Sequence, residues 1–143
     1  MVELRVTLPP IRGQVLIVHD IMYIRNQIRH ILLGAGLRDI AEPEPGSSAY
    51  ATLCKNPGNF SMVIDDYENN PSGMYLLKIL RQDKGTPEAL KNIPFIMLLS
   101  NAEPQSVNEV MSAGASGILL KPFNGVTLLK TVKRVVDKEN KLR

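Results

Sequence analysis

Five short strand candidates alternate along the chain with segments in which apolar residues recur every three or four positions. Four of the candidates are apolar runs at 15–18, 62–64, 95–99 and 117–120, and the remaining one is a mixed stretch at 37–42; the helix-like segments lie at 21–32, 49–54, 74–80, 107–111 and 126–136. Continuous apolar runs are typical of strands buried on both faces, whereas the longer spacing is typical of helices with one buried side. The alternation predicts an α/β fold with a five-stranded parallel sheet flanked by five helices.

The length and composition of the chain are those of one domain. Its 143 residues are 44% hydrophobic and 22% charged, which suffices for a full core but not for a comfortable second domain. We expect an N-terminal leader at 1–13, a folded domain at 14–138 and a basic C-terminal tail at 139–143. Pro9 and Pro10 disfavour regular structure in the leader, which is expected to lie on the surface or to be disordered.

The same features exclude several classes of protein. No run of about 18 apolar residues could span a bilayer, and the N-terminus lacks the pattern of a secretory signal. Cys54 is the single cysteine, so neither an internal disulfide nor a cysteine-based metal cluster can form. The 17 basic and 14 acidic residues are too nearly balanced for a nucleic-acid-binding surface. We expect a cytoplasmic protein that binds neither nucleic acid nor membranes.

Polar side chains stand at the carboxyl ends of four of the expected strands. Asp20 follows the first strand, Asp65 and Asp66 the third, Ser100 the fourth and Lys121 the fifth. In a parallel sheet these ends lie along one edge, where open α/β folds bind their ligands. Clustered carboxylates favour a divalent cation such as Mg²⁺, and a lysine opposite them favours a phosphoryl group. These residues predict a small site for phosphate and Mg²⁺ in which an aspartate could act as a nucleophile.

Four motifs carry a resemblance to a known family. The most specific is AGASGILLKPF at 113–123, and the others are VLIVHD at 15–20, EPEPGSSAYATL at 42–53 and GMYLLKILR at 73–81. They resemble the CheY-like receiver domains of two-component response regulators, over roughly Val15 to Val136. The resemblance implies a flavodoxin-like fold with strand order 2-1-3-4-5. It also implies that Lys121 lies over the phosphoryl site and that the Lys121–Pro122 peptide bond is cis.

The resemblance further implies a role in signalling rather than an enzyme. Such a domain accepts a phosphoryl group on an aspartate from a histidine kinase or a phosphotransfer protein. In this sequence the resemblance assigns Mg²⁺ to Asp20, the acceptor aspartate and a loop carbonyl near Glu68, and phosphate contacts to Lys121 and Ser100. A downstream protein would then bind through the fourth and fifth helices, which with the fifth strand also form a homodimer face in the family. A flavodoxin-type cofactor site is disfavoured because no hydroxyl- or glycine-rich phosphate loop follows the first strand.

Either of two neighbouring aspartates could be the phosphoacceptor. Alignment of the strand from Phe60 onward favours Asp66, whereas the usual loop length counted back from Gly73 selects Asp65. Consecutive side chains of a strand point to opposite faces, so only one of the two can enter the crevice. We expect Asp66, with Asp65 as the alternative, because a loop absorbs a one-residue deletion more easily than a buried strand absorbs a shift in register.

Three positions depart from the pattern of the family. His19 replaces one of two adjacent acids, and imidazole is a poor ligand for a hard cation, so we expect a weakened Mg²⁺ site. Leu99 stands where receivers have Thr or Ser, one residue before Ser100, and Ser100 is equally a candidate helix cap. Ile118 replaces an aromatic residue. These departures support an alternative function, a pseudo-receiver that binds its partner without being phosphorylated.

Overall fold

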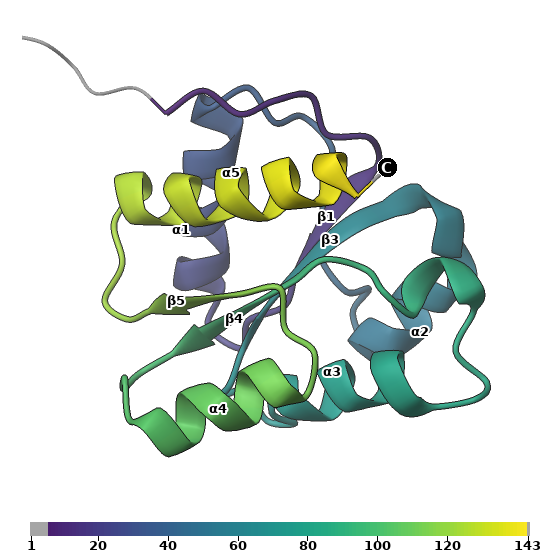
Figure 1. Cartoon of the computed structure of the whole chain (residues 1–143). Helices are drawn as coiled ribbons and strands as arrows, with labels where there is room; N and C mark the ends of the chain where they lie inside the picture. Colours follow the sequence, from purple (N-terminus) through teal and green to yellow (C-terminus); the bar gives the residue numbers. More distant parts are fainter. Residues whose placement is uncertain (1–5, 143) are drawn as a thin grey trace, which may run out of the picture.

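The computed structural model describes residues 6–142 and confirms the α/β architecture (Figure 1). Its parallel sheet has the strand order β2-β1-β3-β4-β5, as the family resemblance implied. The strands are β1 (Gln14–Ile17), β2 (Ile40–Ala41), β3 (Phe60–Asp66), β4 (Phe95–Leu99) and β5 (Gly117–Leu120). The helices are α1 (Met22–Gly34), α2 (Ala49–Lys55), α3 (Gly73–Gln82), α4 (Pro104–Ser112) and α5 (Gly125–Lys141), with short 3-10 helices at Pro57–Asn59 and Glu88–Leu90.

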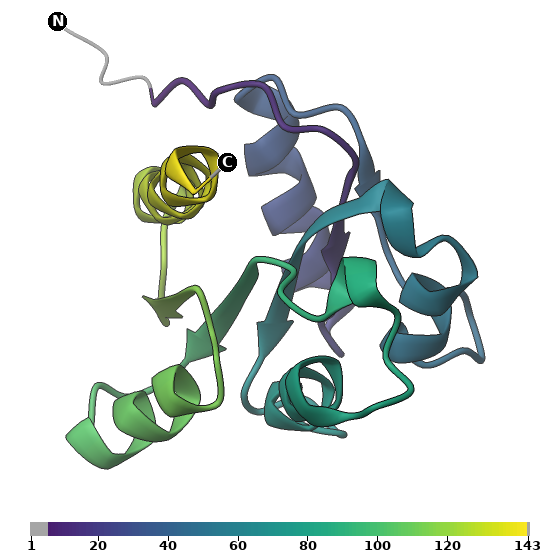
Figure 2. The ribbon, with the colours of Figure 1, turned by 45° about the vertical axis from the view of Figure 1, so that its right-hand side comes forward.

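The helices cover both faces of the sheet and bury two apolar layers. α1 and α5 lie on one face, and α2, α3 and α4 lie on the other (Figure 1, Figure 2). Side chains alternate along each strand, so Ile64 of β3 packs in the layer under α1 and α5, while Val63 packs in the layer under α3. The same alternation continues to the strand ends, where it decides on which side of the sheet each polar side chain lies.

The two ends of the chain and the second strand differ in part from expectation. Leu8 and Ile11 of the leader pack against the layer under α1 and α5, so the described part of the leader lies on the surface of the domain. Residues 1–5 lie outside the described residues. β2 is shorter than expected because only Ile40–Ala41 pair with β1, and Pro43 follows closely and cannot donate to the ladder. α5 continues to Lys141, so most of the expected basic tail is helical.

No helix within residues 6–142 combines the length and the apolar character that crossing a lipid bilayer requires.

Gly73 allows the start of α3 to approach the end of β3 closely. A Cβ atom on this residue would lie 2.7 Å from Met97 Sδ, 3.0 Å from the Asp66 carbonyl oxygen and 3.1 Å from Asp65 Cγ. Contacts this short leave no space for a larger residue unless the strand end or the helix moves, because protein interiors are close-packed. The junction between β3 and α3 is therefore tightly packed around both aspartates.

We expect Gly73→Ala to lower the free energy of unfolding by about 1–3 kcal/mol, because the added methyl group overlaps Met97 and the end of β3. Equilibrium denaturation in urea measures this difference. Gly58→Ala is the matched control, since a Cβ atom there meets nothing within 4 Å. Equal stability of the two variants would show that the junction is more loosely packed than described.

Candidate functional site

The ends of β1, β3 and β5 bring three side chains together on the α1/α5 side of the sheet. His19 lies just beyond β1, Asp66 is the last residue of β3, and Lys121 directly follows β5. Asp66 is 1% exposed, and its carboxylate contacts His19 Nε2 at 2.9 Å and Lys121 Nζ at 2.8 and 3.0 Å. The Glu68 N–H donates to the same carboxylate over 2.8 Å. The predicted cis bond between Lys121 and Pro122 is confirmed.

The surroundings of His19 determine which of its ring nitrogens carries the proton. The Ile21 N–H donates to His19 Nδ1 over 3.1 Å, so Nδ1 is an acceptor and bears no proton. The proton of the neutral ring is then on Nε2, which donates it to Asp66 Oδ2. Arg25 donates to the His19 carbonyl oxygen and so holds the backbone at the end of β1. His19 is therefore an oriented, uncharged donor to Asp66.

The donors around Asp66 keep this residue ionised. Burial alone would raise the pKa of Asp66, but hydrogen bonds from His19, Lys121 and the Glu68 amide, together with the charge of Lys121, lower this pKa to about 2. At neutral pH Asp66 is thus a carboxylate beside an ammonium group. A carboxylate in this state can attack an electrophile without first losing a proton.

Asp65 lies on the opposite side of β3 and has different chemistry. It is 2% exposed, and its Oδ1 accepts from the Asp66 N–H at 2.7 Å and from Asn69 Nδ2 at 2.8 Å. Burial raises the pKa of Asp65 to about 7, and these hydrogen bonds oppose the rise only in part. Below neutral pH Asp65 is therefore mostly a neutral acid, whereas its neighbour is a carboxylate.

Asn69 joins the ends of β1 and β3. Its Nδ2 donates to the Val18 carbonyl at 3.0 Å and to Asp65 at 2.8 Å, and its Oδ1 accepts from the Asp20 N–H at 3.0 Å. The Asp20 carboxylate in turn accepts from the Asn70 N–H at 2.8 Å. Sequence reasoning assigned Asn69 no role, because a loop residue has no periodicity that would reveal a buried side chain.

Ser100 lies at the rim of the site. Its hydroxyl donates to the Glu68 carboxylate, and Lys121 Nζ lies 3.5 Å from the same carboxylate. Ser100 does not cap α4, whose capping position is Glu103. Glu68 therefore connects Ser100 to Lys121 across the edge of the sheet.

Leu99 and Ile118, the other two unusual positions, supply no polar group. Leu99 is buried at the end of β4, and Ile118 packs against the layer under α3. Neither side chain therefore adds a donor to the Asp66 carboxylate.

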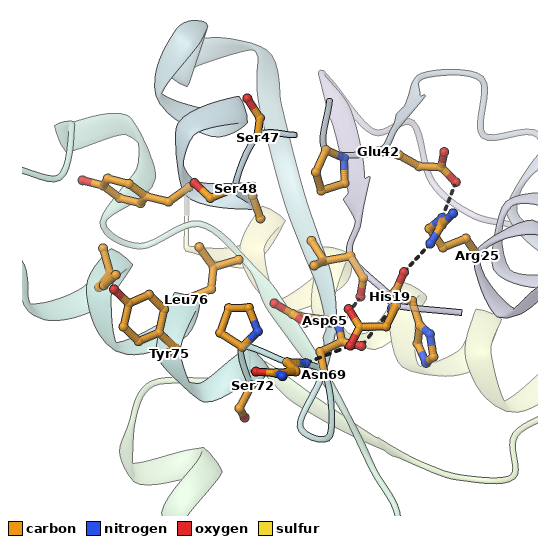
Figure 3. A pocket seen from close by; sticks show the side chains of 18 of the residues that line it. His19, Arg25, Glu42, Ser47, Ser48, Asp65, Asn69, Ser72, Tyr75 and Leu76 are labelled. Carbon is orange, nitrogen blue, oxygen red and sulfur yellow. Dashed lines mark hydrogen bonds and ion pairs between the residues drawn. The ribbon is translucent and has the colours of Figure 1, made fainter. Parts of the chain in front are cut away.

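Two cavities lie on either side of the strand ends. One of about 730 Å³ is lined by the loops that follow β1, β2 and β3, and contains Asp65 and Asn69 on its wall (Figure 3). Asp66 and Lys121 do not line it. A second cavity of about 420 Å³ is lined in part by His19, Ser100 and Lys121. The larger cavity reaches only His19 among the side chains that donate to Asp66, whereas the smaller one reaches both His19 and Lys121, so the smaller cavity is the relevant one for chemistry at that carboxylate.

The fold and the site together define the class of protein. A parallel sheet of this order, with an ionised aspartate and a lysine at its carboxyl edge, is a flavodoxin-like domain of the CheY type. The family model of the response regulator receiver domain matches residues 15–133. The chain belongs to the response regulator receiver domain family.

Individual relatives agree with this assignment. The chemotaxis protein CheY of Pseudomonas aeruginosa is 30% identical over 129 residues, which are 89% of this chain and 98% of that protein. Chemotaxis protein CheY-3 of Vibrio cholerae is 31% identical over 127 residues, covering 87% of this chain and 92% of the relative. The solved structure of Vibrio cholerae CheY4 has a TM-score of 0.73 at 33% identity and covers 87% of this chain and 98% of its own.

Members of this family are generally signalling modules rather than enzymes, and they interact with histidine kinases and with downstream targets. They generally bind Mg²⁺ at the phosphorylation site. Whether the residues present here suit that ion depends on which carboxylate oxygens are available.

The residues around Asp66 do not present the ligand set that Mg²⁺ requires. This ion needs carboxylate oxygens that coordinate it together with several waters. Both oxygens of Asp66 already accept from protein donors, and Asp20 accepts from the Asn70 amide. Within residues 6–142 no group of three or more His, Cys, Asp or Glu side chains is arranged to hold a metal ion. As these side chains lie, a Mg²⁺ ion on Asp66 would have to displace one of its protein donors, so Asp20, Asp66 and Glu68 do not present an open Mg²⁺ site.

We expect Asp65→Asn to stabilise the protein at neutral pH. The pKa of Asp65 rises from 3.8 to about 7 on folding, so its contribution to stability is full below about pH 4 and is lost as the pH rises through about 7. Asparagine keeps the Oδ1 acceptor but does not ionise. The gain in the free energy of unfolding should grow from near zero at about pH 4 to the order of 2–4 kcal/mol at about pH 8.

Urea denaturation of both proteins at several pH values measures this gain. Asp137→Asn is the control, because it makes the same change at a partly exposed carboxylate that pairs with Lys133 on α5. A gain from Asp65→Asn that is constant with pH would contradict the raised pKa.

Proposed function

We propose that the protein is a phosphorylatable receiver in which Asp66 accepts a phosphoryl group from the phosphohistidine of a histidine kinase or a phosphotransfer protein. The observation that carries this proposal is the Asp66 carboxylate, which is buried and ionised and lies 2.8 Å from Lys121 Nζ. The cavity of about 420 Å³ beside His19 and Lys121 offers space for the phosphoryl group.

In the proposed transfer, one carboxylate oxygen of Asp66 attacks the phosphorus atom of the donor. A P–O bond forms while the P–N bond breaks, and the electron pair of that bond remains on the donor imidazole, which takes up a proton from solvent. Lys121 contacts both carboxylate oxygens of Asp66, so its ammonium group can follow the negative charge onto the phosphoryl oxygens. We assign a further phosphate contact to the Ser100 hydroxyl at the rim of the site.

The signal is proposed to leave through α4, β5 and α5. Each of these elements exposes an apolar side chain, namely Met111, Leu120 and Val126. Leu120 directly precedes Lys121, so movement of Lys121 toward a phosphoryl group would reach this surface through the backbone. A downstream protein or a second copy of the chain is the proposed occupant.

Reaction with phosphoramidate, a small donor that contains a P–N bond, tests the choice of acceptor. Intact-protein mass spectrometry should find one added phosphoryl group on the wild-type protein. Asp66→Asn should abolish the addition, because the attacking carboxylate is lost. The matched variant Asp65→Asn should retain it, since Asp66 and its contacts with His19 and Lys121 remain.

If Asp65→Asn loses the added phosphoryl group and Asp66→Asn retains it, the acceptor is Asp65 and not Asp66. No addition to the wild-type protein, with or without Mg²⁺, would refute phosphorylation and leave the pseudo-receiver as the function.

A further inference from the structure

His19 touches the acceptor carboxylate directly. Its largely buried ring places Nε2 at 2.9 Å from Asp66 Oδ2, on the same side of the sheet as Lys121. Oδ2 accepts from His19 and Lys121, and Oδ1 accepts from Lys121 and the Glu68 N–H. A residue that replaces an acid has thus become a donor to the carboxylate that reacts.

Neither ring nitrogen of His19 is available to a metal ion. Nδ1 accepts from the Ile21 N–H, and Nε2 carries the proton that Asp66 accepts. Because Lys121 uses the other lone pair of Oδ2, a metal on this oxygen would have to displace either the His19 N–H or the Lys121 ammonium group. The arrangement therefore competes with a cation instead of helping to hold one.

Protein donors already do what a divalent cation does for clustered carboxylates. A cation in such a place offsets mutual repulsion and orients the acceptor. Here the replacement of an acid by His19 removes one negative charge, and Lys121 neutralises Asp66. The Asn69 amide donates to Asp65, and the Asn70 N–H donates to Asp20. Each of the three aspartates at the ends of β1 and β3 thus has a donor from the chain itself.

We propose that His19 takes the place of the divalent cation, so that Asp66 accepts a phosphoryl group without a metal ion. This inference rests on the function proposed above. The Nε2–H of His19 holds Oδ2 and leaves Oδ1 to form the new P–O bond, while the donor P–N bond breaks. In the acyl phosphate Oδ2 is a carbonyl oxygen and still accepts from His19. The step needs no proton from His19 and no reactant besides the phosphoryl donor.

The test compares phosphorylation of the full chain by phosphoramidate in EDTA and in millimolar Mg²⁺. The initial rates for the wild-type protein should agree within about twofold. His19→Asp restores the second acid and removes the N–H donor, so its rate should fall by about tenfold or more when EDTA replaces Mg²⁺. His30→Asp makes the same change at the exposed histidine of α1 and should stay independent of the metal.

Two further variants separate the donor from the shape of the side chain. His19→Gln can present an N–H near the position of Nε2 and should keep most of the rate in EDTA. His19→Ala has no N–H donor at this place, so its rate of phosphorylation in EDTA should fall by about 10²-fold, the size typical of one lost donor at a reacting group. Thermal unfolding of each variant checks that it is folded.

Direct binding of Mg²⁺ gives a readout that does not depend on phosphorylation. In an amide NMR titration, the wild-type protein should show no saturable shifts at millimolar Mg²⁺, and His19→Asp should show them near Asp20 and Asp66.

The outcomes distinguish this inference from the proposed function. Wild-type phosphorylation that requires Mg²⁺, or saturable Mg²⁺ binding to the wild-type protein, would overturn the inference and leave Asp66 as acceptor. If phosphorylation is independent of the metal but is equally fast in His19→Ala, the proposed replacement of the cation by His19 would be overturned. No phosphorylation under either condition would overturn the proposed function and this inference with it.

Discussion

A carboxylate can remain ionised inside a protein only where donors surround it, and at Asp66 those donors come from distant parts of the chain. His19 is 47 residues away in sequence and Lys121 is 55 residues away. The sheet order places β1 beside β3 but puts β4 between β3 and β5, so the long side chain of Lys121 has to reach across the end of β4. The site therefore exists only when four strands are assembled in register.

Alternation along β3 gives two adjacent aspartates opposite surroundings. Asp66 lies on the side where His19 and Lys121 converge, and their hydrogen bonds outweigh the effect of burial on its pKa. Asp65 lies on the side of α3, where burial outweighs the amide hydrogen bonds that it accepts. Because Asp66 is a carboxylate while Asp65 ionises only near neutral pH, the two adjacent acids repel each other less than two full charges would.

The unusual residues of the site form a consistent set. His19 and Asn69 offer N–H donors to the carboxylates, while Leu99 at the end of β4 and Ile118 in the layer under α3 supply no polar group. Asp66 is itself buried, and electrostatic contacts are stronger where the surroundings are less polar. The site thus depends on a few oriented donors from the protein, among them a neutral imidazole in place of an acid.

The sequence by itself determined the α/β architecture, the limits of β4 and β5, and the cis bond at Lys121–Pro122, because local periodicity, breakers and a specific motif encode these features. It favoured Asp66 as the phosphoacceptor but left Asp65 as an alternative, since both end the same strand. Only the tertiary structure decided which of them faces Lys121, which nitrogen of His19 donates, and that Asn69 links β1 to β3. These features are contacts between residues far apart in the chain, so they depend on strand register and side-chain orientation, which no local pattern records.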